Sequence, residues 1–89
     1  MPDEPFLRVC AREAILAGRL PARDADGTST SQGRGATCAV CREKIPESEL
    51  EMEIEFRREG QSSEVLHLHV RCFAAWEFER TKVPLKERP

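Results

Sequence analysis

Two short pairs of cysteine and histidine residues constrain this chain more than any other feature of its sequence. Cys38 and Cys41 form a C-x2-C pair, and His69 and Cys72 form an H-x2-C pair, with 27 residues between the two pairs. Zinc accepts thiolate sulfur and imidazole nitrogen in a closed tetrahedral site, and a tight C-x2-C turn directs two sulfurs at one ion. The spacing therefore predicts one zinc ion per chain, held by these four residues.

His67 is the alternative histidine ligand. It lies two residues before His69, so both side chains are expected on one face of a strand, and periodicity alone does not choose between them. We prefer His69 because it leaves the standard two-residue gap to Cys72, whereas His67 would leave four. Cys10 lies outside any ligand spacing and is expected to be a small apolar residue on a helix.

The predicted site also carries charge. Three thiolates and a neutral imidazole would leave a zinc site with a net charge of about −1. Arg42, Lys44 and Arg71 are sequence neighbours of the ligands. Either they offset this charge through hydrogen bonds to sulfur, or they are solvated surface residues.

The length of the chain is a reason to expect such a metal site. Eighty-nine residues allow one small domain, 39% of them hydrophobic, and a core of that size gives only marginal stability. Disulfides are the other use of four cysteines, but they belong to oxidising compartments. The first residues, MPDEPFLRVCAREA, are charged and helical rather than signal-like, and no apolar run reaches membrane-spanning length. We therefore expect a cytoplasmic protein.

Four segments follow one another along the chain. Residues 1–20 are expected to form an N-terminal helix, with helical periodicity over 3–19 and an ending at Gly18 and Pro21. Residues 21–36 are rich in Gly, Ser, Thr and Asp, which predicts a flexible linker. Residues 37–83 are the zinc-finger domain, and residues 84–89 are a tail. The predicted apolar stripe of the first helix consists of Phe6, Leu7, Cys10, Ala14 and Ala17.

Strict alternation marks the centre of the zinc-finger segment. In residues 49–56, ELEMEIEF, every second residue is apolar, which predicts a strand with one buried face and one wet, glutamate-lined face. A loop around Gly60 leads to a second strand over 64–69. A second helix is predicted over 70–82, before Pro84. The expected fold class is a small α+β zinc-stabilised domain: helix, linker, zinc-binding turn, hairpin and helix. The predicted buried residues of the first strand are Leu50, Met52, Ile54 and Phe56.

This arrangement resembles a treble-clef zinc finger. The stretches CAVCREKIPESELEMEIEF and LHLHVRCFAAWEFER contain a C-x2-C turn, an Ile–Pro turn, a hairpin, an H-x2-C pair and a following aromatic residue. That order is similar to LIM-type and poly(ADP-ribose)-polymerase-type fingers. The chain is also similar to a group of small uncharacterised bacterial zinc proteins, in which a helix ending in GRLP precedes the finger. The resemblance covers residues 37–80 and implies a metal and a topology rather than one function.

Two functions follow from these features. We expect a structural zinc module that mediates protein–protein interaction, without enzymatic activity, because a catalytic zinc keeps one position open. No membrane partner and no small-molecule substrate are expected. The alternative is a nucleic-acid-binding zinc finger acting as a transcriptional accessory, although a net charge of −2 disfavours it. The basic residues that would serve this alternative are Arg8, Arg12, Arg19, Arg23, Arg34, Lys82, Lys86 and Arg88.

Overall fold

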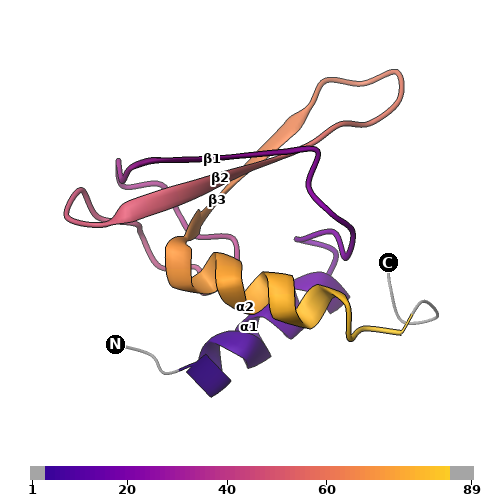
Figure 1. Ribbon diagram of the computed structural model, residues 1–89, viewed down its shortest axis with the longest axis horizontal. Helices are drawn as coiled ribbons and strands as arrows, with labels where there is room; N and C mark the ends of the chain where they lie inside the picture. The colour runs from indigo at the N-terminus through magenta and orange to yellow at the C-terminus, as the bar shows by residue number, and fades with distance from the viewer. Residues whose placement is uncertain (1–3, 85–89) are drawn as a thin grey trace.

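A three-stranded antiparallel sheet with two helices on one side of it forms the fold (Figure 1). The computed structural model describes residues 4–84, and within that range no helix is long and apolar enough to cross a membrane. The elements are α1 (Glu4–Leu16), β1 (Gly27–Gln32), β2 (Leu50–Phe56), β3 (Glu64–His69) and α2 (Val70–Arg80), and the strand order is β1-β2-β3. The predicted α+β class is confirmed. The hairpin and the second helix lie where the sequence pattern predicted them, although α2 ends two residues earlier.

β1 corrects the linker prediction. Residues 21–36 are not free of structure, because Gly27–Gln32 pairs along its whole length with β2. A strand held by backbone hydrogen bonds to its neighbour needs no large apolar side chains, which is why composition did not reveal it. The chain leaves β1 at Gly33, where a Cβ atom would lie 2.1 Å from the Pro46 carbonyl oxygen. Only glycine fits this close approach.

α1 is shorter than predicted and presents a different stripe to the core. It ends at Leu16, and Gly18 then takes a left-handed conformation with φ 81° that stops the helix. Phe6 is 53% exposed, so its place in the predicted stripe is wrong, as is that of the exposed Ala17. Two of the four buried residues are alanines, whose small side chains allow a neighbouring helix to approach closely. The buried residues of α1 are Leu7, Ala11, Ala14 and Ile15.

That neighbouring helix is α2, which lies alongside α1 beneath the sheet (Figure 1). The Nε of Arg8 on α1 donates to the Glu79 carboxylate on α2 at 3.1 Å, and Glu79 is only 6% exposed. Trp76 lies at the centre of this layer, fully buried, with its ring 5.9 Å from that of Phe56 on β2. Its indole Nε1 donates to the Pro21 carbonyl oxygen at 2.9 Å. The N-terminal helix and the segment with the predicted ligands therefore share one hydrophobic core.

Candidate metal centre

The structure brings the four predicted ligands together at one end of the hairpin. The sulfurs of Cys38, Cys41 and Cys72 and a ring nitrogen of His69 all lie within 4.8 Å of one another. His69 Nδ1 is 3.5 Å from the Cys41 sulfur and 3.8 Å from the Cys72 sulfur. A tetrahedral ion with bonds of about 2.3 Å to sulfur and 2.0–2.1 Å to nitrogen sets these donors about 3.6 Å apart. The cluster therefore fits one tetrahedral metal ion.

A tight turn presents the first two cysteines. The backbone N–H of Cys38 donates to the Glu43 carbonyl at 2.8 Å, and the N–H of Arg42 donates to the Cys38 carbonyl at 2.9 Å. Arg42 takes the left-handed conformation, with φ 67°, that lets the chain reverse over so few residues. The Ala39 N–H donates to the His67 carbonyl at 2.9 Å, which ties the turn to β3. The turn and the strand that carries the histidine ligand are therefore held together by the backbone.

The sulfurs lie in a polar backbone environment that favours thiolate at one of them. The pKa of Cys38 falls to about 4, first because the Cys72 thiol donates a hydrogen bond to it, and then because backbone N–H groups do so. The same hydrogen bond raises the pKa of Cys72, and burial raises it further. Burial also raises the pKa of Cys41. These hydrogen bonds favour thiolate at Cys38, and a bound cation would favour thiolate at all three sulfurs.

His69 is oriented by a hydrogen bond on the far side of its ring. It is the last residue of β3 and precedes α2, with an extended backbone and only 2% exposure. Its Nε2 lies 3.2 Å from the Lys44 carbonyl oxygen, which can only accept, so Nε2 carries the proton. The Nδ1 lone pair then faces the sulfurs. This arrangement, in which the second ring nitrogen binds a carbonyl, is typical of histidines that ligate metal.

Cys72 reaches the cluster from the first turn of α2. The helix begins at Val70, directly after His69, so the two ligands are separated by the start of the helix. The unpaired N–H groups and the positive end of the helix dipole stabilise negative charge there. Because Cys72 is fully buried, this contribution is little screened by solvent.

His67 does not join the cysteines. Its Nδ1 lies 2.7 Å from a carboxylate oxygen of Glu51, which is itself 1% exposed. The prediction that Glu51 lies on a wet face is wrong, because the metal-binding turn packs against β3 at that end of the sheet. The hairpin register holds a signal for it, since Glu51 pairs directly with His69. A nearby carboxylate, Glu53, accepts from the Ser31 hydroxyl at 3.3 Å, so both acids have partners within the protein.

Two of the cations expected near the sulfurs, Arg71 and Lys44, contribute differently. Arg71 donates to the Glu49 carboxylate at 2.6 Å, which raises the Arg71 pKa, and the charges of Cys72 and Cys41 raise it further. Arg71 is therefore close enough to offset thiolate charge without a hydrogen bond to sulfur. Lys44 contributes through its backbone carbonyl. Cys10 is half-buried on α1 and packs against the core, outside the cluster.

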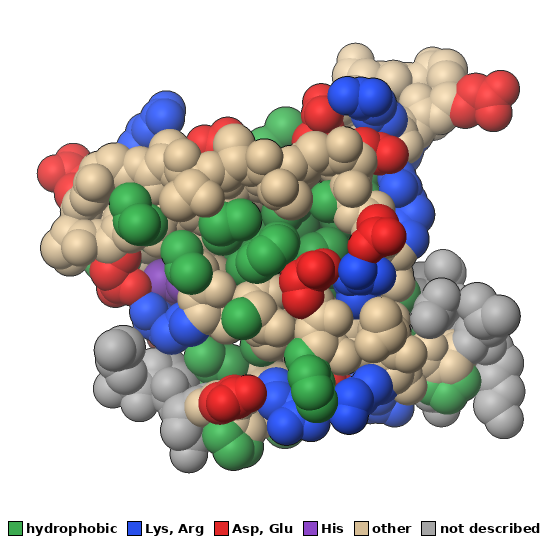
Figure 2. Space-filling view, viewed as in Figure 1, with side chains coloured by type: hydrophobic (Ala, Val, Ile, Leu, Met, Phe, Trp, Pro, Cys, Tyr) green, Lys and Arg blue, Asp and Glu red, His purple; other side chains and the backbone are tan. Residues whose placement is uncertain are grey.

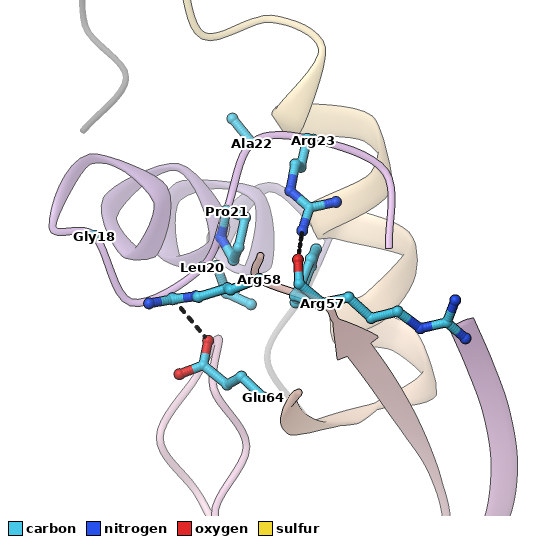
Figure 3. A pocket seen from close by; sticks show the side chains of 9 residues that line it. Gly18, Leu20, Pro21, Ala22, Arg23, Arg57, Arg58 and Glu64 are labelled. Atoms are coloured by element: carbon cyan, nitrogen blue, oxygen red, sulfur yellow. Dashed lines mark hydrogen bonds and ion pairs between the residues drawn. The ribbon is translucent and has the colours of Figure 1, made fainter. Parts of the chain in front are cut away.

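A surface hollow lies apart from this centre. It measures about 530 Å³ and lies between the end of α1, the segment after it and the base of the hairpin loop (Figure 3). Arg23, Arg57 and Arg58 line it, but Arg23 donates to the Arg57 carbonyl and Arg58 to the Glu64 carboxylate. The Arg23 contact joins the segment after α1 to the hairpin, whereas the Arg58 contact lies within the hairpin. None of the four candidate ligands lines the hollow.

The geometry makes a clear prediction for the two histidines. We expect His69→Ala to lower zinc affinity more than about 100-fold, because losing a ligand costs more than the 10–100-fold typical of an outer-shell partner. His67→Ala is the matched control and is expected to change affinity less than about tenfold. A competition titration with a chromophoric chelator measures both. An equal loss in the two variants would contradict the assignment.

The donor set indicates a metal site but does not identify a protein family. Three cysteines and one histidine form a metal cluster that occurs on many unrelated folds, so the donor set does not identify a family. The resemblance to treble-clef fingers therefore stays a prediction. No family model, no curated protein and no solved structure matches this chain.

Proposed function

We propose that this protein is a structural zinc module that mediates protein–protein interaction. The observation that carries the proposal is the convergence of four protein donors, three sulfurs and one imidazole nitrogen, on one point. Soft thiolates with imidazole favour zinc over magnesium, calcium or manganese. With four protein ligands no position is left for water or substrate, which is the mark of a structural rather than a catalytic zinc.

The order of elements supports a treble-clef arrangement for the zinc module. The first ligand pair lies in the turn before β2, and the second pair lies at the junction of β3 and α2. A zinc ion would thus connect the turn before β2 to the junction of β3 and α2, in addition to the backbone hydrogen bond from Ala39 to His67. This is the role of zinc in small folds whose cores are too small to be stable alone.

An apolar patch on the helices supports a protein partner. Phe6 and Val9 on α1 and Phe78 on α2 are 53%, 55% and 43% exposed. The guanidinium of Arg8 and the ammonium of Lys82 each lie 4.0 Å from the Phe78 ring centre. Figure 2 shows blue and green side chains side by side along this helical layer. Aromatic and aliphatic groups rimmed by cations are typical of protein-binding surfaces.

The ion pairs weigh against a nucleic-acid interface. Arg8 and Arg23, two of the arginines expected to contact phosphates, instead bind carboxylates of this chain, and so do three other arginines. Freeing them would cost those contacts, whereas phosphate binding relies on available cations. The pairs are Arg8–Glu79, Arg23–Asp26, Arg58–Glu64, Arg71–Glu49 and Arg80–Asp24.

The proposal is tested with the zinc-loaded chain as bait in affinity capture. Native mass spectrometry of the bait is expected to show one zinc per chain. Val9→Ser on the patch is compared with Val65→Ser on β3, a matched control because the two valines are 55% and 46% exposed. We expect a captured protein that Val9→Ser reduces at least about tenfold and Val65→Ser leaves unchanged. A bait without zinc, or capture of nucleic acid instead, would contradict the proposal.

A further inference from the structure

β1 is an open edge of the sheet. The strand order places β2 on one side of β1. On the other side, from Thr28 to Gln32, no backbone hydrogen bond links β1 to the rest of residues 4–84. Within that range, the one hydrogen bond there is made by the Gln32 side chain, which donates to the Glu47 carbonyl. Figure 1 views the sheet edge-on with β1 nearest the reader, and Figure 2 shows the strand as an uncovered tan band. An exposed edge of this kind offers backbone donors and acceptors to another strand.

The register shows which groups face outward. The Gly33 N–H donates to the Glu49 carbonyl at 2.8 Å, and these residues continue the β1–β2 register. Hydrogen-bonded pairs recur at every second residue of an antiparallel ladder, so Ser31 and Ser29 also direct their backbone groups at β2. Thr28, Thr30 and Gln32 therefore direct their N–H and C=O groups away from the sheet.

The sequence of β1 contains none of the features that normally protect an edge. Native edge strands carry lysine, proline, bulges or inward-pointing charges that prevent pairing with another chain. Gly27–Gln32 reads GTSTSQ, without charge or proline, and pairs with β2 without a bulge. All three residues with outward backbone groups are exposed.

We propose that β1 pairs antiparallel with β1 of a second copy of this chain, joining two three-stranded sheets into one six-stranded sheet. A two-fold axis between the two Thr30 residues pairs Thr30 with its own copy and Thr28 with Gln32 of the copy. These residues carry the outward backbone groups, so each pair exchanges two hydrogen bonds. The strand is thus self-complementary, which a closed two-fold contact requires.

The charge of β1 is compatible with pairing to a second copy. Gly27–Gln32 carries no charged side chain, so the two-fold contact brings no like charges together. Asp26, directly before β1, is bound within its own chain, because its carboxylate accepts from the Arg57 N–H at 2.6 Å and from the Arg23 guanidinium at 3.2 Å. Its charge is therefore already balanced outside the contact.

Apolar side chains lie on the strand next to β1. Leu50 pairs with Gln32 and is 52% exposed, and Met52 pairs with Thr30 and is half-buried. Paired residues share one face of a sheet, so Leu50 and Met52 lie on the same face as the side chains of Gln32 and Thr30. Figure 2 shows green side chains gathered directly beneath the β1 band. The proposed contact extends the sheet beside this apolar surface, and it uses neither the metal ligands nor the helical patch.

The test is sedimentation equilibrium of the zinc-loaded full chain from about 10 μM to 1 mM. We expect the average mass to rise above the 10.1 kDa of one chain, with a dissociation constant on the order of tens of micromolar, because the contact is small. Thr30→Lys places two ammonium groups together at the axis and is expected to weaken the dimer at least about tenfold. Ser62→Lys, in the hairpin loop, adds the same charge away from β1 and is expected to change nothing.

Backbone amide shifts in NMR spectra identify the surface that associates. With rising concentration, the amides of Thr28, Thr30 and Gln32 are expected to shift and to gain protection from exchange, while those of Ser29 and Ser31 stay nearly constant. A chain that remains monomeric at 1 mM would overturn the proposal. So would a dimer whose shifts map to the helices and that tolerates Thr30→Lys.

Discussion

Removing zinc is expected to unfold the protein rather than merely empty a site. Zinc binding contributes about 10–16 kcal/mol of apparent free energy in small zinc-finger peptides, whereas whole domains are stable by about 5–15 kcal/mol. Cys38, Cys72 and His69 are buried, so removing the cation would leave their donor atoms without a metal bond in the interior of a small domain. Far-UV circular dichroism with a strong chelator is expected to show loss of both helices and the hairpin.

A pair of cysteine substitutions separates the metal from general thiol effects. Cys72→Ser is expected to behave like the chelated wild type, without cooperative unfolding. Cys10→Ser removes a thiol outside the cluster and is expected to bind one zinc and unfold cooperatively, with a cost of about 1 kcal/mol. Loss of α1 together with the hairpin is expected because α1 packs on α2, which begins at the ligands. A chelated chain that keeps its secondary structure would contradict this view.

The clustering of the four candidate ligands and the hairpin were predictable because their signals are local. The ligand pairs lie in a turn and at a strand–helix junction, where a two-residue gap fixes the direction of both side chains. The alternation in ELEMEIEF predicted β2, and Ile54 and Phe56 are buried as expected. The choice of His69 over His67 also agrees with the ring orientations, because Nδ1 of His67 forms a hydrogen bond with the Glu51 carboxylate.

The remaining features depend on neighbours that are distant in sequence. β1 was missed because its strand character comes from pairing with β2, about twenty residues later, and not from its own side chains. Leu50 is exposed although the alternation predicts burial, because it lies at the end of β2 beside β1. The buried stripe of α1 differs from the predicted one because α1 packs against α2 with a face that includes Ala11 and Ile15 and leaves Phe6 exposed. In each case tertiary packing overrides the local pattern.

Trp76→Ala is expected to give the largest loss of stability of any single substitution away from the metal, about 3–5 kcal/mol. The indole is fully buried and packs edge-on against Phe56, and Phe73 lies 5.8 Å from it. Its N–H also holds the Pro21 carbonyl, at the start of the segment that leads from α1 to β1. Urea unfolding at saturating zinc measures the change.

Two comparisons separate packing from hydrogen bonding at this position. Trp76→Phe keeps most of the apolar volume but loses the bond to Pro21, for an expected cost of about 1–3 kcal/mol. Phe78→Ala removes an aromatic ring that is 43% exposed on the same helix and is expected to cost less than about 1 kcal/mol. If Trp76→Ala lowered the free energy of unfolding no more than Phe78→Ala, Trp76 would not be at the centre of the core. The proposed zinc ion would hold the metal-site turn to the start of α2, whereas Trp76 joins α2 to the segment after α1. Trp76→Ala should therefore raise amide exchange in α1 more than in the metal-binding turn.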